Sequence, residues 1–317
     1  MGQGMNVSMQ DTWNLAWKVC SVAAGHSKPD ILQTYQSERH AVACELISVD
    51  RQFAQFYSRK LDSDASSDDI RRDNQSFRNQ FYDFLSGVAV EYKPSVLVAR
   101  EQLPQADSEE PVSKQHLASK VVLGRRIPSC RILNQAEVRP VQLHDLLKAN
   151  GYWRLVVFAG DLSNARQWAR LGTLGKALSS PSSCLHKYPS RSRTGQDNHI
   201  ATPHMSGQLH KVESRRNSMV ELFTIHAANR TSISLLELPE VFYGPWDEEL
   251  GWDYWKVFVD DDALHEGPAK AYEKLGIDRS RGCMVVVRPD QHVSFIGELE
   301  DIDEVERFFA GCLVAEP

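Results

Sequence analysis

Apolar and polar positions alternate with a helical period near the start of the chain. From Met5 onward, apolar residues recur every three or four positions, and this spacing predicts a helix over residues 5–24 with one buried face. The expected buried face consists of Met5, Met9, Trp13, Ala16, Cys20 and Ala23. Polar residues such as Asn14 and Lys18 fall largely off this face.

The next stretch continues in helices and then becomes polar. The helical period predicts helices over residues 30–60 and 68–86. Residues 101–117 are rich in proline, acidic and other polar residues, which is typical of a linker between domains. We therefore expect a helical domain over residues 1–100 and a second domain over residues 118–317.

Continuous apolar runs of strand length mark the second domain. The runs at residues 153–160 and 219–227 are suited to the middle of a sheet. Further strands are predicted at 255–260, 283–288 and 292–297, and helices at 140–150, 164–179, 263–275 and 301–313. This order of strands and helices, with a hairpin before the last helix, is typical of a thioredoxin-like α/β domain. A polar insertion over residues 181–217 is expected to be exposed and mobile.

Composition narrows the classes of protein to which the chain can belong. Of its 317 residues, 42% are hydrophobic and 25% are charged, which is usual for a globular protein with a sizeable core. The net charge of −6 argues against nucleic acid as a partner. No apolar run is long enough to span a bilayer, and no signal peptide is recognisable, so we expect no membrane partner and a cytoplasmic location.

The six cysteines do not indicate thiol or metal chemistry. They are scattered, and none belongs to a C-x-x-C pair or to a Cys/His cluster with zinc spacing. We expect free thiols, mostly buried, and no metal site. The turn after the first apolar strand, residues 161–164, lacks the cysteine pair of a redox thioredoxin, and Cys283 is expected to be buried in a strand. A thiol oxidoreductase is therefore disfavoured.

The five residues that open the chain after Met1 are the candidate binding site. Gly2 and Gly4 allow a tight turn and a close approach of the backbone to a ligand, with Gln3, Met5 and Asn6 beside them. The helix that follows presents unpaired N–H groups and a partial positive charge at its start. Such a place suits a phosphate or the carbonyl side of a flavin ring. Taken alone, Gly-x-Gly before a helix is more often an ordinary turn.

Several motifs, taken together, resemble the FAD-dependent phenol 2-monooxygenase (phenol hydroxylase) family. The motifs are GQGMN at residues 2–6, NLAWK at 14–18, YQSER at 35–39, FTIHA at 223–227, VVVRPD at 285–290 and FFAGCLVAEP at 308–317. They run through the chain and are interrupted by the polar insertion. The resemblance implies a fold in which the helical C-terminal segment of an FAD-binding domain is followed by a thioredoxin-like domain.

The resemblance also implies a function and a set of partners. In this family the loop matched by Gly2, Gln3, Gly4, Met5 and Asn6 lies beside the isoalloxazine ring of FAD. Its members use NADPH as the reductant and add one oxygen atom ortho to the hydroxyl of a phenolic substrate. The thioredoxin-like domain supports dimerisation, so a homodimer is expected.

The parts of the family that carry catalysis have no match in this sequence. The catalytic Asp, Tyr and Arg, the Gly-Asp motif and the strand–GxGxxG–helix unit for the ADP moiety are all missing, so no residue is assigned a catalytic role. We expect a truncated chain that is inactive alone and has an incomplete FAD site. The alternative is a non-catalytic thioredoxin-like module for dimerisation or interaction. A visible spectrum with bound flavin would separate the two.

Overall fold

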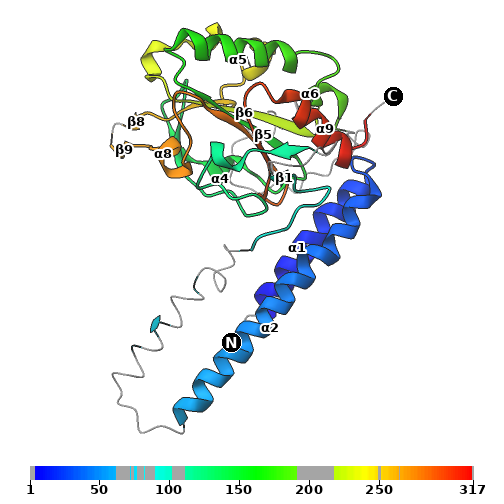
Figure 1. Ribbon diagram of the computed structural model, residues 1–317. Coiled ribbons are helices and arrows are strands. Elements are labelled where there is room, and N and C mark those ends of the chain that lie inside the picture. The colour runs from blue at the N-terminus through cyan, green and yellow to red at the C-terminus, as the bar shows by residue number, and fades with distance from the viewer. Residues whose placement is uncertain are drawn as a thin grey trace.

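A long pair of helices stands beside an α/β body in the computed structural model (Figure 1). The structure describes residues 4–61, 72, 75–76, 82, 90–101, 111–190, 218–248, 251–263 and 265–315. Helix α1, Gly4–Ala23, and helix α2, Thr34–Leu61, pack side by side and are joined by the 3-10 helix η1, Pro29–Gln33. Most of the helix expected over residues 68–86 lies outside the described residues.

The body is built on one sheet that has seven strands among the described residues, in the order β11-β10-β5-β6-β7-β3-β4. Its strands are β3 Arg131–Asn134, β4 Pro140–Gln142, β5 Trp153–Gly160, β6 Val220–His226, β7 Val257–Val259, β10 Cys283–Val287 and β11 Val293–Gly297. The helices of the body are α4 Leu143–Leu146, α5 Ala165–Leu178, α6 Cys184–Lys187, α8 Ala271–Leu275 and α9 Ile302–Cys312.

The connections within this sheet are those of a thioredoxin-like domain. Strands β5 and β6 are parallel and are connected through α5, whereas β10 lies antiparallel to β5 and forms a hairpin with β11 before α9. The predicted thioredoxin-like domain is confirmed. Two strands that the sequence analysis did not predict, β3 and β4, extend the sheet beyond β7. Short strand pairs β1, Arg100–Glu101, with β2, Val112–Ser113, and β8, Asp262–Ala263, with β9, Gly267–Pro268, lie outside it.

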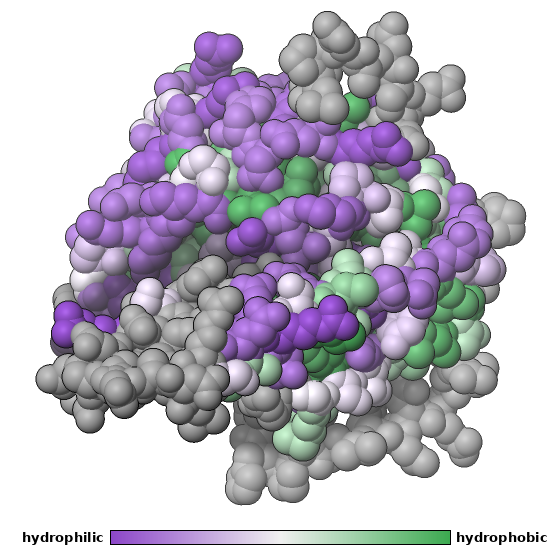
Figure 2. Space-filling view, turned by 60° about the horizontal axis from the view of Figure 1, so that its bottom comes forward, coloured by the Kyte–Doolittle hydropathy of each residue, from purple (hydrophilic) through white to green (hydrophobic). Residues whose placement is uncertain are grey.

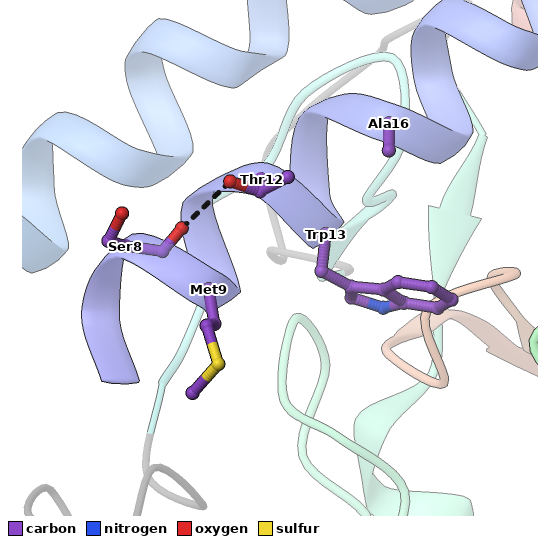
Figure 3. Close-up of a pocket in the computed structure, with 5 residues that line it drawn as sticks. All are labelled: Ser8, Met9, Thr12, Trp13 and Ala16. Atoms are coloured by element: carbon purple, nitrogen blue, oxygen red, sulfur yellow. Dashed lines mark hydrogen bonds between the residues drawn. The ribbon is translucent and has the colours of Figure 1, made fainter. Parts of the chain in front are cut away.

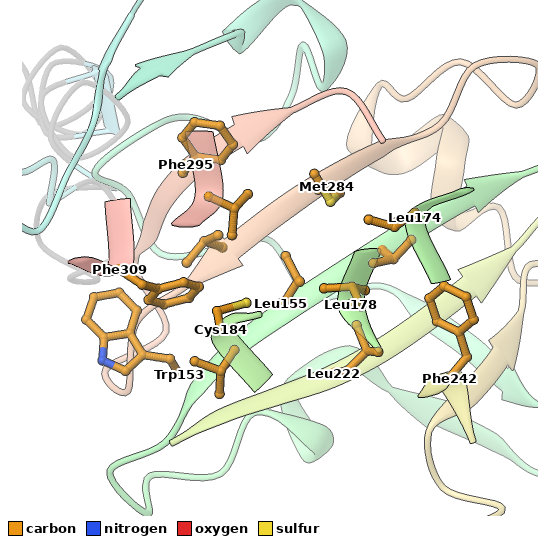
Figure 4. Packing of buried hydrophobic residues seen from close by; sticks show 14 of the residues in the cluster. Trp153, Leu155, Leu174, Leu178, Cys184, Leu222, Phe242, Met284, Phe295 and Phe309 are labelled. Atoms are coloured by element: carbon orange, nitrogen blue, oxygen red, sulfur yellow. The ribbon is translucent and has the colours of Figure 1, made fainter. Parts of the chain in front are cut away.

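The core lies on both faces of the central strand β5, all eight residues of which are buried. Trp153, Leu155 and Val157 belong to the cluster that α5 and α9 cover (Figure 4). Val156 and Phe158 point to the opposite cluster, which includes residues of α8. This burial on both faces explains why β5 is a continuous apolar run rather than an alternating one.

Two predicted helices are largely replaced by other structure. Residues 140–150 were expected to be helical, but β4 occupies Pro140–Gln142 and pairs with β3, and only the single turn α4 follows. Residues 263–275 were also expected to be one helix, but among the described residues of this range only Ala271–Leu275 is helical. Gly267, at φ +68°, and Pro268 form β9 instead, because neither residue favours a helix interior.

The first part of the polar insertion is also different from the expectation. Residues 181–217 were expected to be exposed, but Cys184 and Tyr188 are fully buried, and α6 contacts both β6 and α9. The remaining residues, 191–217, lie outside the described part of the chain. The serine-rich composition concealed this anchoring because, among the described residues 181–190, only Ser183, Cys184 and Tyr188 are buried.

Candidate functional site

Helix α1 buries a different side from the one that its apolar pattern predicts. Met5, Met9 and Trp13 are 71%, 56% and 44% exposed, and the other three residues of the predicted buried face are exposed as well. The buried residues of α1 are Asn14, Trp17, Lys18 and Ser21. The prediction that the apolar stripe forms the buried face is therefore wrong for the chain as described.

The polar side of α1 is buried because it meets charges from distant parts of the chain. Nδ2 of Asn14 and Nζ of Lys18 donate to Oε2 of Glu38 on α2, at 2.7 and 2.8 Å. Arg39 donates to Asp11 at 2.6 Å. Burial lowers the pKa of Lys18 to about 8, and the neighbouring Glu38 carboxylate opposes this shift. Periodicity within one helix cannot detect such partners.

The start of α1 offers an open backbone surface. Gly4, Met5 and Asn6 are exposed, whereas Gly2 and Gln3 lie outside the described residues. A Cβ added at Gly4 would meet no atom within 4 Å, so a flat group can approach the backbone there. No acidic side chain lies in the first turn of α1 to offset the partial positive charge that a helix carries at its start. These features fit an electron-rich group of a ligand at this place.

A pocket of about 260 Å³ lies along the exposed side of α1. It is lined by Ser8, Met9, Thr12, Trp13 and Ala16 (Figure 3). All five residues come from one helix, so the described residues supply only one wall. On the face shown in Figure 2, other apolar side chains likewise lie among hydrophilic ones at the surface. The apolar wall of the pocket is unsuited to remain in water.

The thioredoxin-like domain shows no reactive thiol among its described residues. The turn after β5 holds Asp161 and Ser163, and Asn164 caps α5 by accepting a hydrogen bond from the backbone of Arg166. Burial raises the pKa of Cys283 far above its usual range and therefore keeps this thiol protonated. The prediction of free, mostly buried cysteines is confirmed: Cys20 and Cys44 are exposed, and Cys130, Cys184, Cys283 and Cys312 are buried.

Neither metal clusters nor membrane spans appear in the described part of the chain. Within it, no group of three or more His, Cys, Asp or Glu side chains is arranged to hold a metal ion. Within the same residues, no helix combines the length and the apolar composition needed to cross a bilayer.

Two family models together account for most of the chain. The model described as phenol hydroxylase, C-terminal dimerisation domain, matches residues 90–317. The model described as FAD binding domain matches residues 1–50, which include the start of α1. The second match places the candidate site within an FAD-binding domain segment.

Known proteins of this kind resemble the chain over almost its whole length. It is 32% identical over 313 residues to a phenol 2-monooxygenase of Aspergillus fumigatus, a match that covers 98% of this chain and 45% of that protein. It is also 32% identical over 315 residues to a 3-hydroxybenzoate 4-monooxygenase of Comamonas testosteroni, covering 99% of this chain and 44% of the relative.

The chain spans less than half the length of these relatives. The resemblance inferred from the sequence motifs is confirmed. An FAD-binding segment followed by a thioredoxin-like dimerisation domain is the arrangement that the motifs predicted. The chain therefore belongs to the phenol hydroxylase family of FAD-dependent monooxygenases.

Proposed function

We propose that this chain forms the C-terminal part of an FAD- and NADPH-dependent monooxygenase that hydroxylates phenolic compounds in the cytosol. The flavin-facing residues are Gly2, Gln3, Gly4, Met5 and Asn6. Support comes from the family match at residues 1–50 and from the exposed start of α1, where the backbone is open at Gly4. The alternative activity of a thiol oxidoreductase finds no support in the buried, protonated Cys283.

The observation that carries the proposal is the exposed apolar side of α1. Met5, Met9 and Trp13 lie in water while Asn14 and Lys18 of the same helix are buried. Apolar surface of this kind is stabilised by about 25 cal/mol for each Å² removed from water. We infer that the remaining part of the FAD-binding domain, present in the relatives that are more than twice as long, covers this side and forms the other walls of the pocket.

The residues of this chain would contribute binding and electrostatics rather than chemistry. FAD, when bound, supplies the oxygen-transfer chemistry that amino-acid side chains lack. The partial positive charge at the start of α1 would stabilise negative charge on the pyrimidine side of the ring. Gly4 would allow the ring to lie against the backbone, because no Cβ stands in the way. One segment encloses little of a large cofactor, so the chain alone should bind FAD weakly.

A second function, dimerisation, is favoured by a group of aromatic residues in the thioredoxin-like domain. Trp246 is 57% exposed, and its ring packs edge-on against Trp252, which packs against the buried Tyr243. Exposed aromatic residues that are held rigidly are typical centres of protein interfaces. We propose that this group contacts the same surface of a second copy in a homodimer, as the dimerisation-domain match at residues 90–317 suggests.

The proposal of a flavin site is tested by complementation. The 317-residue chain is purified alone and together with the preceding part of the Aspergillus fumigatus relative, and each sample is mixed with FAD and then freed of unbound FAD by gel filtration. We expect a colourless chain alone and, in the mixture, a yellow complex that oxidises NADPH when phenol is added. Gly4→Val should abolish flavin uptake, whereas Gly172→Val, at another open helical glycine, should not. A mixture that stays colourless, or that binds FAD equally well with Gly4→Val, would overturn the proposal.

A further inference from the structure

The polar side of α1 is held by a buried group of charges that reaches into the thioredoxin-like domain. Glu38 accepts a hydrogen bond from Lys18 of α1 on one side. On the other side it accepts two from Arg288, at 2.6 and 3.1 Å, and Arg288 follows directly after β10. Asp290 accepts two further hydrogen bonds from Arg288, at 3.0 and 2.6 Å. The four side chains are at most 2% exposed, and their two positive and two negative charges balance.

Aromatic rings fix the same arginine in place. The guanidinium carbon of Arg288 lies 5.3 Å from the ring centroid of Trp17 on α1 and 5.1 Å from that of Tyr92. Nε1 of Trp17 donates to Oδ2 of Asp290 at 3.1 Å. Arg288 and Asp290 therefore contact α1 both directly, through Trp17, and indirectly, through Glu38 and Lys18.

Such a contact allows few alternative positions of the helix. An apolar interface tolerates small rotations and slips of a helix, because its contacts are not directional. A buried charge that loses its partner is strongly destabilising, so a shifted α1 would leave Lys18 or Arg288 unpaired in the interior. Buried polar groups are known to fix the register of packed helices in this way.

We propose that Arg288 is a positioning residue that fixes the flavin-facing start of α1 from the thioredoxin-like domain. This inference rests on the flavin site proposed above. Arg288 does not touch the site; it acts through Trp17 directly and through Glu38 on Lys18. The thioredoxin-like domain would thus take part in shaping the flavin site although it has no reactive thiol among its described residues.

The length of α1 between Lys18 and Gly4 turns a small tilt of the helix into a large displacement of its start. Lys18 and Gly4 are fourteen positions apart, which corresponds to about 21 Å of helix at 1.5 Å per residue. A tilt of about 5° at Lys18 therefore moves Gly4 by about 2 Å. Displacements of about 1 Å at a reacting centre can lower a rate roughly a hundredfold. A weakened contact at Arg288 would accordingly displace the start of α1.

The test measures the position of α1 without any flavin. Spin labels are attached to Ser8→Cys on α1 and Thr173→Cys on α5, both exposed, in a background where the exposed Cys20 and Cys44 are replaced by serine. The distance between the labels is measured by pulsed electron paramagnetic resonance in the otherwise intact chain and in Arg288→Met. Hydrogen exchange of α1 and of β5 is followed in the same proteins.

We expect a single narrow distance distribution in the intact chain and a distribution at least twice as broad in Arg288→Met. Exchange of α1 amides should rise at least tenfold while that of β5 stays unchanged, whereas simple loss of stability would raise both. Arg281→Met, which removes an arginine paired with Glu298 in the same domain, is the control and should change neither.

Glu38→Gln tests the same proposal from the other side of the contact. It removes the central negative charge, which α2 supplies, and leaves the thioredoxin-like domain unchanged. It should broaden the distribution as well, and it replaces Arg288→Met if that variant does not fold. A folded Arg288→Met or Glu38→Gln with the distance distribution of the intact chain would overturn the proposal. Failure of the chain to take up FAD would leave this outcome unaffected, because no flavin is present.

Discussion

The hydroxyl of Tyr272 bridges the backbones of the two central parallel strands. It accepts a hydrogen bond from the backbone N–H of Gly160 at 2.8 Å and donates one to the carbonyl of Ile225 at 2.7 Å. The register between β5 and β6 shifts at this point, between Phe158 and Gly160. A side chain from α8 thus satisfies backbone groups close to the place where the regular sheet pairing is interrupted.

Tyr272→Phe should therefore destabilise the domain. The substitution keeps the ring but leaves a buried N–H and a buried carbonyl with one partner fewer, which costs about 1–3 kcal/mol. The free energy of unfolding is measured by urea denaturation. The control is Tyr188→Phe: the hydroxyl of Tyr188 is buried and has no hydrogen-bond partner among the described residues, so its removal should cost little or be stabilising. Equal losses of unfolding free energy in Tyr272→Phe and Tyr188→Phe would contradict the stabilising role of the Tyr272 hydroxyl.

His226 should make the stability depend on pH. Burial lowers its pKa from 6.5 to about 4, against the opposing charges of Asp261 and Asp161, while its Nε2 lies 3.0 Å from Oε1 of Gln135. Between these two values the unfolded chain binds a proton that the folded chain does not. The free energy of unfolding therefore falls as the pH drops from 6.5 to about 4, by up to about 3 kcal/mol.

The measurement is urea denaturation at pH 7 and at pH 4.5. His226→Gln cannot take up this proton and can retain a polar contact near Gln135, so it should lose less stability than the intact chain between the two pH values. Carboxylates that titrate in the same range affect both proteins equally and cancel in the comparison. The same pH dependence in both proteins would show that His226 is not responsible.

Gly282 should tolerate no side chain. Its φ is +67°, and a Cβ there would lie 2.1 Å from the carbonyl oxygen of Phe158 in β5. Gly282→Ala should lower the free energy of unfolding by more than about 2 kcal/mol, because both the backbone conformation and the contact are unfavourable. Gly172→Ala, in the open middle of α5, should instead raise it by up to about 1 kcal/mol. Thermal unfolding distinguishes the two, and a stable Gly282→Ala would contradict the structure.

The sequence was sufficient for those elements whose apolar pattern reflects their own burial. The run at Trp153–Gly160 predicted β5 correctly because both of its faces are covered. The 3.6-residue period predicted α5 and α9 because each of these helices buries one side. Strands β3 and β4 are only four and three residues long, so neither gives a clear apolar pattern, although three of the four residues of β3 are buried. Local pattern alone could not show that they pair with each other across the sheet edge.

The candidate site was predicted in part. The open glycine at the start of α1 was expected from sequence, but the side of α1 that is buried was not. Asn14 and Lys18 are polar and would by themselves belong in water. Their burial depends on Glu38 and on Arg288, which lies 250 positions beyond Glu38. The order of apolar and polar residues within one helix does not show which distant side chains will pair with it.

The two exposed apolar surfaces should behave differently in assembly. Trp246 lies within the segment matched by the dimerisation-domain family, whereas Met9 lies within the FAD-binding segment. If the thioredoxin-like domain forms the homodimer, a carboxylate at position 246 would have to leave water in the interface. This transfer is unfavourable and should separate the subunits. Trp246→Asp should raise the dissociation constant of the dimer at least a hundredfold in sedimentation equilibrium. Met9→Asp places the same charge on the other surface and should leave the dimer intact. A dimer that is weakened by Met9→Asp and not by Trp246→Asp would move the subunit contact from the thioredoxin-like domain to α1.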